Sequence, residues 1–164
     1  MNQQLPFRLI EVMKTDELKR TVGSWQLKRE VDYYGNELET ELSEVCCCVE
    51  DIQSVTKQLS QDFVPDGYYG SDNFADYPGA IRDITEFGDI VCFAFSADGA
   101  PFCLDYRNNR KEPTVIWWDD ICWRLIAPNF SAFSICLIFA VNKGLKVMLD
   151  LNQFYRTRIE DLRR

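Results

Sequence analysis

Aspartates at or near the ends of three apolar runs are the residues of this chain whose side chains are best suited to catalysis or binding. They lie between Asp89 and Asp120, in the stretch DIVCFAFSADGAPFCLDYRNNRKEPTVIWWDD. Carboxylates in such places act as catalytic acids or bases, as metal ligands, as turn formers, or as a charged face for a partner. The choice among these roles decides whether the chain is an enzyme or a binding module.

The chain has no histidine. This removes Ser-His-Asp and Cys-His catalysis, HExxH zinc sites and the usual imidazole base. No glycine-rich phosphate loop is present either. A carboxylate-dependent hydrolase or a metal-binding protein needs several carboxylates converging at one point, and the spacing of a calcium loop is absent. We therefore predict no catalytic residues, no metal and no cofactor, with the carboxylate-dependent or metal-binding protein as an alternative.

The seven cysteines predict free thiols. Their number is odd, Cys46, Cys47 and Cys48 are adjacent, and no CxxC pair exists, so neither a disulfide framework nor a zinc ribbon is indicated. A redox role for the triplet is the alternative. The N-terminus lacks the apolar segment of a signal peptide, and the apolar run 130–141 is too short to span a bilayer. We expect a soluble cytoplasmic protein that does not bind membranes.

Acidic charge is concentrated in the middle of the chain. The net charge is −8, and residues 66–120 hold 11 acidic and 4 basic groups. Phosphate repulsion argues against nucleic-acid binding, whereas a basic protein would be attracted. The simpler interpretation is that the negative charge only keeps the protein soluble.

The N-terminal part, about residues 1–44, is expected to be mainly helical. Leu27, Val31 and Tyr34 have helical spacing, and Gly35 follows as a stop, which predicts a helix over 25–34. A second helix is predicted over 16–22, whereas 6–13 fits a strand or a helix. A strand over 45–49 and a helix over 51–62 form the next unit, 45–62.

The second half predicts an antiparallel meander of strands over 90–95, 101–106, 114–118 and 122–127. Asp98-Gly99 supplies a hairpin turn, and the third strand is rich in β-branched and aromatic residues. Helices over 129–163 are expected to pack on this sheet core, which spans 80–127. The chain is thus predicted to be a single α+β domain over 1–164, with an antiparallel or mixed sheet.

This meander predicts where the aspartates lie. The turns containing Asp98 and Asp119-Asp120 follow strands that run in the same direction, so they should lie at one end of the sheet. Turn chemistry alone would explain these residues. Asp105 lies inside a strand, so it should face water or a partner, or pair with Arg107 or Arg124.

A partner-binding surface is the functional hypothesis for these aspartates. Aromatic residues anchor protein interfaces, and nearby carboxylates attract basic partners. Tyr68 and Tyr69 lie in a long turn-rich loop, and core packing is the alternative for the tryptophans, which alternate across the sheet. The candidate binding residues are Asp98, Asp105, Trp117, Trp118, Asp119, Asp120, Tyr68 and Tyr69.

The ordered motifs of the second half resemble the SUKH superfamily, which includes the yeast Smi/Knr cell-wall regulator. The match covers roughly residues 80–140, whereas the first half departs from the family pattern: LKREVDYYGN lacks its proline. The resemblance implies an α+β domain that acts by binding, without common catalytic residues. Many bacterial members are immunity proteins that block a toxin's active site, and a regulatory scaffold is the alternative. The matching residues are Asp98-Gly99, Phe102, Leu104-Asp105, Val115, Trp118-Asp119 and Ala127 to Phe133.

Overall fold

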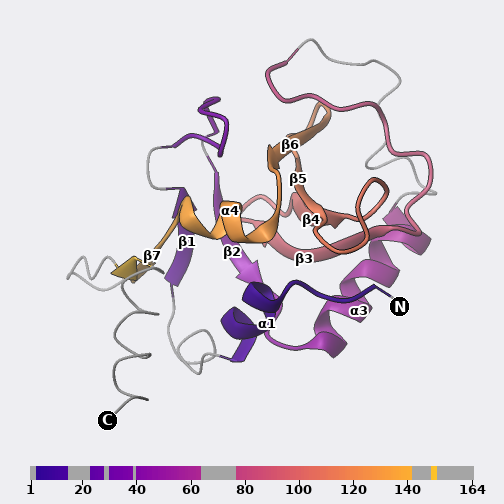
Figure 1. Ribbon diagram of the computed structural model, residues 1–164, viewed down its shortest axis with the longest axis horizontal. Helices are drawn as coiled ribbons and strands as arrows, with labels where there is room; N and C mark the ends of the chain where they lie inside the picture. Colours follow the sequence, from indigo (N-terminus) through magenta and orange to yellow (C-terminus); the bar gives the residue numbers. More distant parts are fainter. Residues whose placement is uncertain are drawn as a thin grey trace.

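One antiparallel sheet organises the fold. The computed structural model describes residues 3–14, 23–27, 30–38, 40–63, 77–141 and 149–150. Within these ranges the strands follow the order β6-β5-β4-β3-β2-β1-β7-β8, and every neighbouring pair is antiparallel. Figure 1 shows the sheet with helices packed against it, so the predicted α+β class is confirmed. The strands are β1 (Gly23–Leu27), β2 (Glu41–Val45), β3 (Ile90–Ser96), β4 (Pro101–Asp105), β5 (Thr114–Trp118), β6 (Trp123–Ala127), β7 (Leu137–Val141) and β8 (Leu149–Asp150).

The predicted meander is present as β3 to β6, with strand ends within one residue of the expected positions. Asp105 pairs with Ile90 across β3 and β4, so the register brings the β3–β4 turn to the end opposite this pair. Gly99 has a φ of +88° in that turn, a conformation that glycine adopts without a steric penalty. The strands β3, β4 and β5 are almost wholly buried, with α3 packed on β3 and α4 packed on β5.

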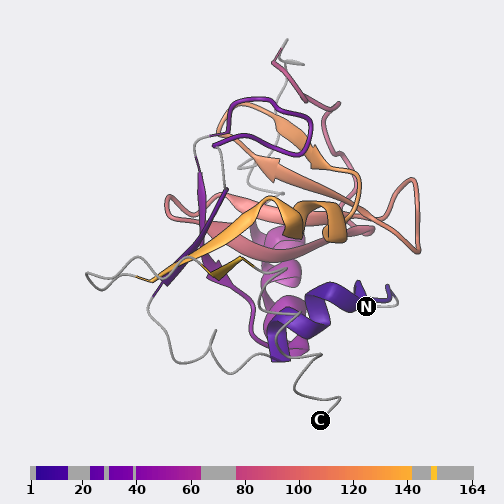
Figure 2. The same cartoon turned by 60° about the vertical axis from the view of Figure 1, so that its left-hand side comes forward.

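Helices lie on the two faces of the sheet. The helix α4 (Phe130–Ile135) packs on β5 and β6 and contacts α1 (Phe7–Lys14), whereas α3 (Val49–Gln58) packs on β3. Figure 2 shows α4 in front of the central strands and α3 behind them. The Asn129 side chain caps α4 by accepting a hydrogen bond from the Ala132 N–H at 2.8 Å. A π-helical turn, η1 (Leu59–Phe63), continues α3.

Aromatic rings fill the core beneath α4. Phe93 makes edge contacts with Phe130 and Phe133 of that helix, and Phe102 lies 6.0 Å from Phe133 between ring centres. These residues come from two neighbouring strands and the helix, so they tie α4 to the middle of the sheet. Rings of this size contribute much of the apolar area that stabilises a small domain.

The prediction of a helix over 25–34 is wrong. Residues 23–27 form β1, which pairs with β2 on one side and β7 on the other. All five residues of β1 pair with β7 and two of them also pair with β2, and this long-range pairing overrides a weak helical spacing. The predicted mainly helical region 1–44 therefore contributes two inner strands as well as α1. The helix expected over 16–22 lies outside the described residues.

The strand expected over 45–49 is displaced toward the N-terminus. β2 spans Glu41–Val45, and Cys46 to Cys48 link it to α3, with Cys48 as the N-cap residue. The helix expected over 51–62 begins two residues earlier, at Val49. The Cys46 N–H still donates to the Phe93 carbonyl at 2.9 Å, which extends the pairing with β3 by one residue.

The helices expected over 129–163 are corrected in two places. The helix α4 ends at Ile135, and the apolar residues after it form β7, which pairs along its full length with β1. Residues 149–150 form β8 rather than part of a final helix. The backbone N–H and C=O groups of this apolar segment find hydrogen-bond partners in the sheet because β1 would otherwise have an unpaired edge. The rest of the predicted final helix lies outside the described residues.

No helix among the described residues is long and apolar enough to cross a membrane. All seven cysteines are free thiols, and four of them are buried: Cys46, Cys92, Cys103 and Cys122.

Candidate functional site

One end of the sheet gathers acidic side chains from three separate chain segments. Leu42 pairs with Ser96, and Phe102 pairs with Trp117, so the β3–β4 turn, the β5–β6 turn and the start of β2 lie at the same end. The two turns are separated by two strand spacings, about 10 Å. We call this region the acidic end, and its carboxylates are Glu30, Glu37, Glu41, Asp98, Asp119 and Asp120.

The β3–β4 turn presents Asp98 to solvent. The Asp98 carboxylate accepts a hydrogen bond from the Ser96 hydroxyl, and that hydroxyl in turn accepts from the Ala100 N–H at 2.9 Å. Ser96 is buried, so the hydroxyl anchors the turn from within. The carboxylate is thereby fixed at the rim of the acidic end while it remains exposed.

The β5–β6 turn is built on Asp119. Its Oδ1 accepts from the Ile121 N–H at 3.3 Å and the Cys122 N–H at 3.1 Å. Its Oδ2 lies 3.4 Å from Arg124 Nη1, and both side chains are nearly buried. These bonds show that the Asp119 side chain stabilises the turn, whereas its neighbour Asp120 is exposed.

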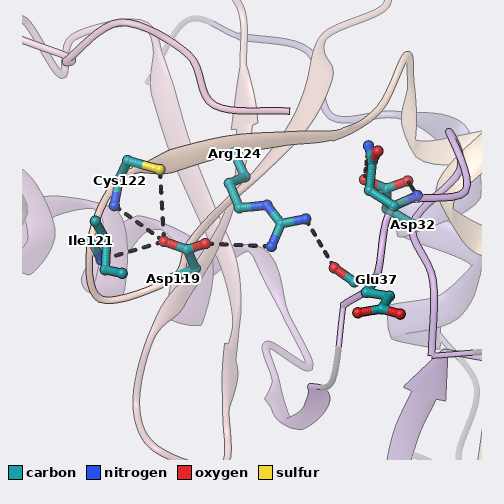
Figure 3. Close-up of polar contacts among 7 residues, drawn as sticks. Asp32, Glu37, Asp119, Ile121, Cys122 and Arg124 are labelled. Atoms are coloured by element: carbon teal, nitrogen blue, oxygen red, sulfur yellow. Dashed lines mark hydrogen bonds and ion pairs between the residues drawn. The ribbon is translucent and has the colours of Figure 1, made fainter. Parts of the chain in front are cut away.

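Arg124 joins this turn to the segment that precedes β2. Its Nη2 donates to the Glu37 carbonyl at 3.0 Å, so a single guanidinium bridges two parts of the acidic end (Figure 3). Its Nε has no hydrogen-bond partner among the described residues. The arginine is only 8% exposed. Its contacts with the Asp119 carboxylate and the Glu37 carbonyl therefore compensate the free-energy cost of burying its charge.

A tight turn over 32–36 carries two exposed tyrosines. The buried Asp32 carboxylate accepts from the Tyr34 N–H at 2.8 Å, the Asn36 N–H at 2.9 Å and the Asn36 side-chain amide at 3.0 Å. Tyr33 and Tyr34 are each about half exposed and pack edge to face. The Tyr33 N–H donates to the Ile126 carbonyl, which fixes the turn beside the edge strand β6 (Figure 2).

Backbone strain is concentrated at the acidic end. Among the described residues, Glu30 and Asp120 are the non-glycine residues with positive φ, at +54° and +65°. Side chains disfavour this conformation, and such residues cluster at functional sites. Both strained residues are acidic, and both lie at this end of the sheet.

A pocket opens between the segment before β2 and the β3–β4 turn. It has a volume of about 570 Å³. We call it the acidic notch, and the residues around it include Leu27, Glu30, Thr40, Glu41, Asp98 and Trp117. A second pocket of about 420 Å³ lies between α3 and β3. The Thr56 hydroxyl of this second pocket already bonds both the N–H and the carbonyl of Cys92. No carboxylate is among the residues that line the pocket, so it has fewer groups that could bind a charged ligand.

The other predicted site residues lie in varied environments. Asp105 is 4% exposed and pairs with Arg107, whose Nη2 lies 2.7 Å from its Oδ2. The hydrogen bond with Asp105 raises the pKa of the Arg107 guanidinium. Trp118 is buried and packs on Trp123 on the side of the sheet away from the notch residue Trp117. Tyr68 and Tyr69 lie outside the described residues.

The structure thus brings Asp98, Trp117, Asp119 and Asp120 together, as the meander predicted for the aspartates. It places Asp105 elsewhere, because β4 and β5 carry their Asp105–Thr114 pair at the opposite end. Sequence reasoning missed Glu30, Tyr33 and Tyr34. The Asp-Tyr-Tyr-Gly-Asn stretch is a strong turn signal, since Asp and Gly-Asn favour tight turns, but the helical spacing of the residues before it predicts the end of a helix.

No group of three cysteine, aspartate or glutamate side chains in the described part of the chain could hold a metal ion. Burial and the nearby Asp119 carboxylate raise the pKa of the Cys122 thiol to about 11. Burial likewise raises that of Cys46 to about 12. Such thiols are protonated at neutral pH and are poor nucleophiles.

Comparison with known protein families shows which family this chain belongs to. The chain matches the SMI1 / KNR4 family (SUKH-1) over residues 4–135. It belongs to this family. The match includes α1, the Asp32 turn and the whole meander, and so extends well beyond the resemblance over 80–140. Proteins of this family generally act through protein–protein interaction rather than catalysis. No curated relative and no solved structure matches the chain.

Proposed function

We propose that this SUKH-1 protein is a bacterial immunity protein that acts in the cytoplasm and neutralises a toxin. It would do so by covering the basic active-site cleft of the toxin with its acidic end. The observation that carries this proposal is the convergence of exposed carboxylates from three segments at one end of the sheet. Two exposed, rigidly held tyrosines lie along the edge strand β6. Seven free thiols suit a reducing compartment.

The physical basis is steric and electrostatic. A nuclease-like cleft is basic because it binds phosphates, and carboxylates occupy such a cleft in place of the nucleic acid. Complementary charge accelerates the encounter, and aromatic anchors then slow dissociation. Tyr33 and Tyr34 suit the second role because the Asp32 hydrogen bonds hold their backbone before binding.

The test begins with capture of the tagged protein from its native lysate at low salt. A stoichiometric basic partner is then purified, and its enzymatic activity is measured with and without this chain. The variant for the surface is the triple charge reversal Glu30→Lys, Asp98→Lys and Asp120→Lys. Asp119 is left intact because its substitution would disturb the β5–β6 turn.

We expect the triple variant to lose roughly 100-fold or more in affinity by calorimetry, because each close charge pair contributes on the order of 1.5 kcal/mol or more. Glu112→Lys is the matched control: it reverses an exposed charge in the β4–β5 loop, at the opposite end of the sheet. An unchanged dissociation constant for the triple variant would contradict the surface assignment. Several substoichiometric endogenous proteins and no inhibited enzyme would indicate a regulatory scaffold instead.

A further inference from the structure

We propose that Cys92 and Cys103 form a reversible disulfide across β3 and β4 under oxidising conditions, and that this bond locks the hairpin that presents Asp98. Both thiols are free in this structure. The two strands hold them directly opposite each other and fully buried in the core. The inference goes beyond the proposed function and is independent of it, because the bond forms without any partner.

The ladder between β3 and β4 places the two cysteines at a position suited to a cross-strand bond. The Tyr106 N–H donates to the Asp89 carbonyl at 2.9 Å, and hydrogen-bonded and non-hydrogen-bonded pairs alternate along the strands from there. Along this register Cys92–Cys103 is a non-hydrogen-bonded pair. In such pairs the Cα atoms lie about 4.5 Å apart, which is within the range that a disulfide spans.

The backbone of Cys92 agrees with this assignment. Its N–H donates to the Thr56 hydroxyl at 3.0 Å, and the same hydroxyl donates to its carbonyl at 3.4 Å. Both backbone groups therefore point toward α3 and away from β4, as those of a non-hydrogen-bonded pair must. The thiols lie together, since the Cys92 side chain forms a hydrogen bond with that of Cys103. The two sulfur atoms are thus neighbours before oxidation, so bond formation requires little rearrangement of the strands.

The cysteine triplet is less suited to a bond with Cys92. The Cys46 N–H donates to the Phe93 carbonyl, so Cys46 lies opposite Phe93 in the ladder rather than opposite Cys92. Cys47 and Cys48 lie in the link between β2 and α3 and are partly exposed, so an oxidant in solution reaches them first. These two thiols therefore serve as an internal reference for oxidation.

Hydrogen peroxide is an oxidant that balances the reaction. The sulfur of one deprotonated thiol attacks a peroxide oxygen, the O–O bond breaks, and a sulfenic acid forms as water takes up the thiol proton. The sulfur of the other thiol attacks the sulfenic sulfur, the S–S bond forms, and the S–O bond breaks to release a second water. The thiols lose two hydrogens, and peroxide is reduced to two waters. A dithiol reductant reverses the bond by exchange.

The reaction should be slow in the folded chain. Burial and the hydrogen bond with Cys92 raise the pKa of the Cys103 thiol well above its ordinary value. The thiolate is the reactive form, so oxidation depends on local opening of the sheet, which admits water and peroxide. The pair therefore responds to sustained oxidation rather than to a brief exposure.

The bond would tie the turn that carries Asp98 to the middle of the sheet. Residues 93–102 lie between the two cysteines and include this turn, and the register of β3 shifts directly after Cys92. A cross-link removes conformational freedom from the opened hairpin, so the oxidised chain opens less often. Oxidation thus stabilises one of the turns of the acidic end.

The test uses the full chain, which is treated with hydrogen peroxide for hours, labelled with N-ethylmaleimide under denaturing conditions and cleaved on the N-terminal side of aspartates. Cleavage at Asp98 separates the two cysteines: Cys92 falls in peptide 89–97 and Cys103 in peptide 98–104. We expect the two peptides to be joined, with a mass two hydrogens below their sum, and to be separated by dithiothreitol. Loss of labelling at Cys47 shows that the oxidant has acted.

The lock is measured by urea unfolding before and after oxidation. Peroxide should raise the midpoint of the original chain by roughly 1 M, as expected for a cross-link that closes a short loop. Cys92→Ala should abolish this rise. Cys46→Ala is the matched control, because it also removes one buried thiol beside β3, and it should retain the joined peptides and the rise. The peptide result on the original chain does not depend on the folding of either variant.

Two results would overturn the inference. One is that Cys92 and Cys103 remain labelled, or are joined to other cysteines, at a peroxide exposure that has already oxidised Cys47. The other is a chain with the joined peptides but an unchanged or lower urea midpoint, which would show that the bond does not lock the hairpin. Either failure is distinguishable from that of the proposed function, because toxin inhibition is measured separately on the reduced chain.

Discussion

At the scale of single residues, neighbouring aspartates have opposite roles. Asp119 is mostly buried, organises the β5–β6 turn and holds the Arg124 guanidinium, whereas Asp120 is exposed and has a left-handed backbone conformation. A buried arginine that loses its carboxylate keeps an uncompensated charge, and the free-energy cost is large. Identity alone does not separate the two residues, because both are carboxylates in the same turn.

Asp119→Asn should therefore lower the free energy of unfolding by about 2 kcal/mol, since the amide keeps an acceptor for the turn N–H groups but loses the charge that Arg124 requires. Asp120→Asn should change it by less than about 0.5 kcal/mol, because the residue is exposed and asparagine tolerates its backbone conformation. Urea unfolding of both variants checks this. Equal destabilisation would show that the Arg124 pair contributes little.

At the scale of elements, the turn over 32–36 decides how the tyrosines are presented. It replaces a predicted helix end, and its geometry depends on one buried carboxylate that accepts three hydrogen bonds. Gly35 has a φ of +85°, which lets the chain reverse within the turn. The turn is joined to β6 through Tyr33 and to Arg124 through Glu37, so the element is coupled to the edge of the sheet.

Asp32→Ala should destabilise the fold by about 1–3 kcal/mol, because it leaves buried donors without an acceptor. Hydrogen exchange at the Tyr34 and Asn36 amides should accelerate, and partner affinity should fall because the tyrosines lose their fixed positions. Asp32→Asn keeps one acceptor oxygen and should have a smaller effect. Unchanged amide exchange in the alanine variant would contradict this account of the turn.

At the scale of the whole molecule, the sheet core keeps its thiols protonated. Burial raises the pKa of Cys46 to about 12, and burial with the Asp119 carboxylate raises that of Cys122 to about 11, from an ordinary value of 9.0. The unfolded chain releases these protons near the ordinary value, whereas the folded chain retains them. The stabilisation from the neutral thiols is thus complete below about pH 9 and is lost as the pH rises to 11 or 12.

The free energy of unfolding should consequently fall between about pH 9 and pH 11, and the slope should be shallower in Cys46→Ala and Cys122→Ala. The slope is the readout, because the substitutions also alter packing and hence the absolute stability. Urea midpoints across this pH range measure it. Slopes equal to that of the original chain would show that these thiols ionise similarly in both states.

The sequence by itself determined the meander and the end of the sheet at which the aspartates gather. These features depend on local signals: the alternation in 101–106, the Asp98-Gly99 hairpin and the β-branched run at 114–118. Strands connected by short turns pair with their sequence neighbours, so local patterns suffice for β3 to β6. The α+β class and the absence of histidine-based catalysis followed in the same way.

Tertiary structure alone decided the rest. β1 and β7 pair across more than 100 residues of chain, and no local pattern encodes such a partner. With that pairing, residues predicted to be helical form the strands β1 and β7 instead, and β1 leads to Glu30 at the acidic end. The burial of Asp105 and Asp119 was likewise set by their distant surroundings. Short-range propensity is weak, about 1 kcal/mol per residue or less, so a continuous ladder of long-range hydrogen bonds overrides it.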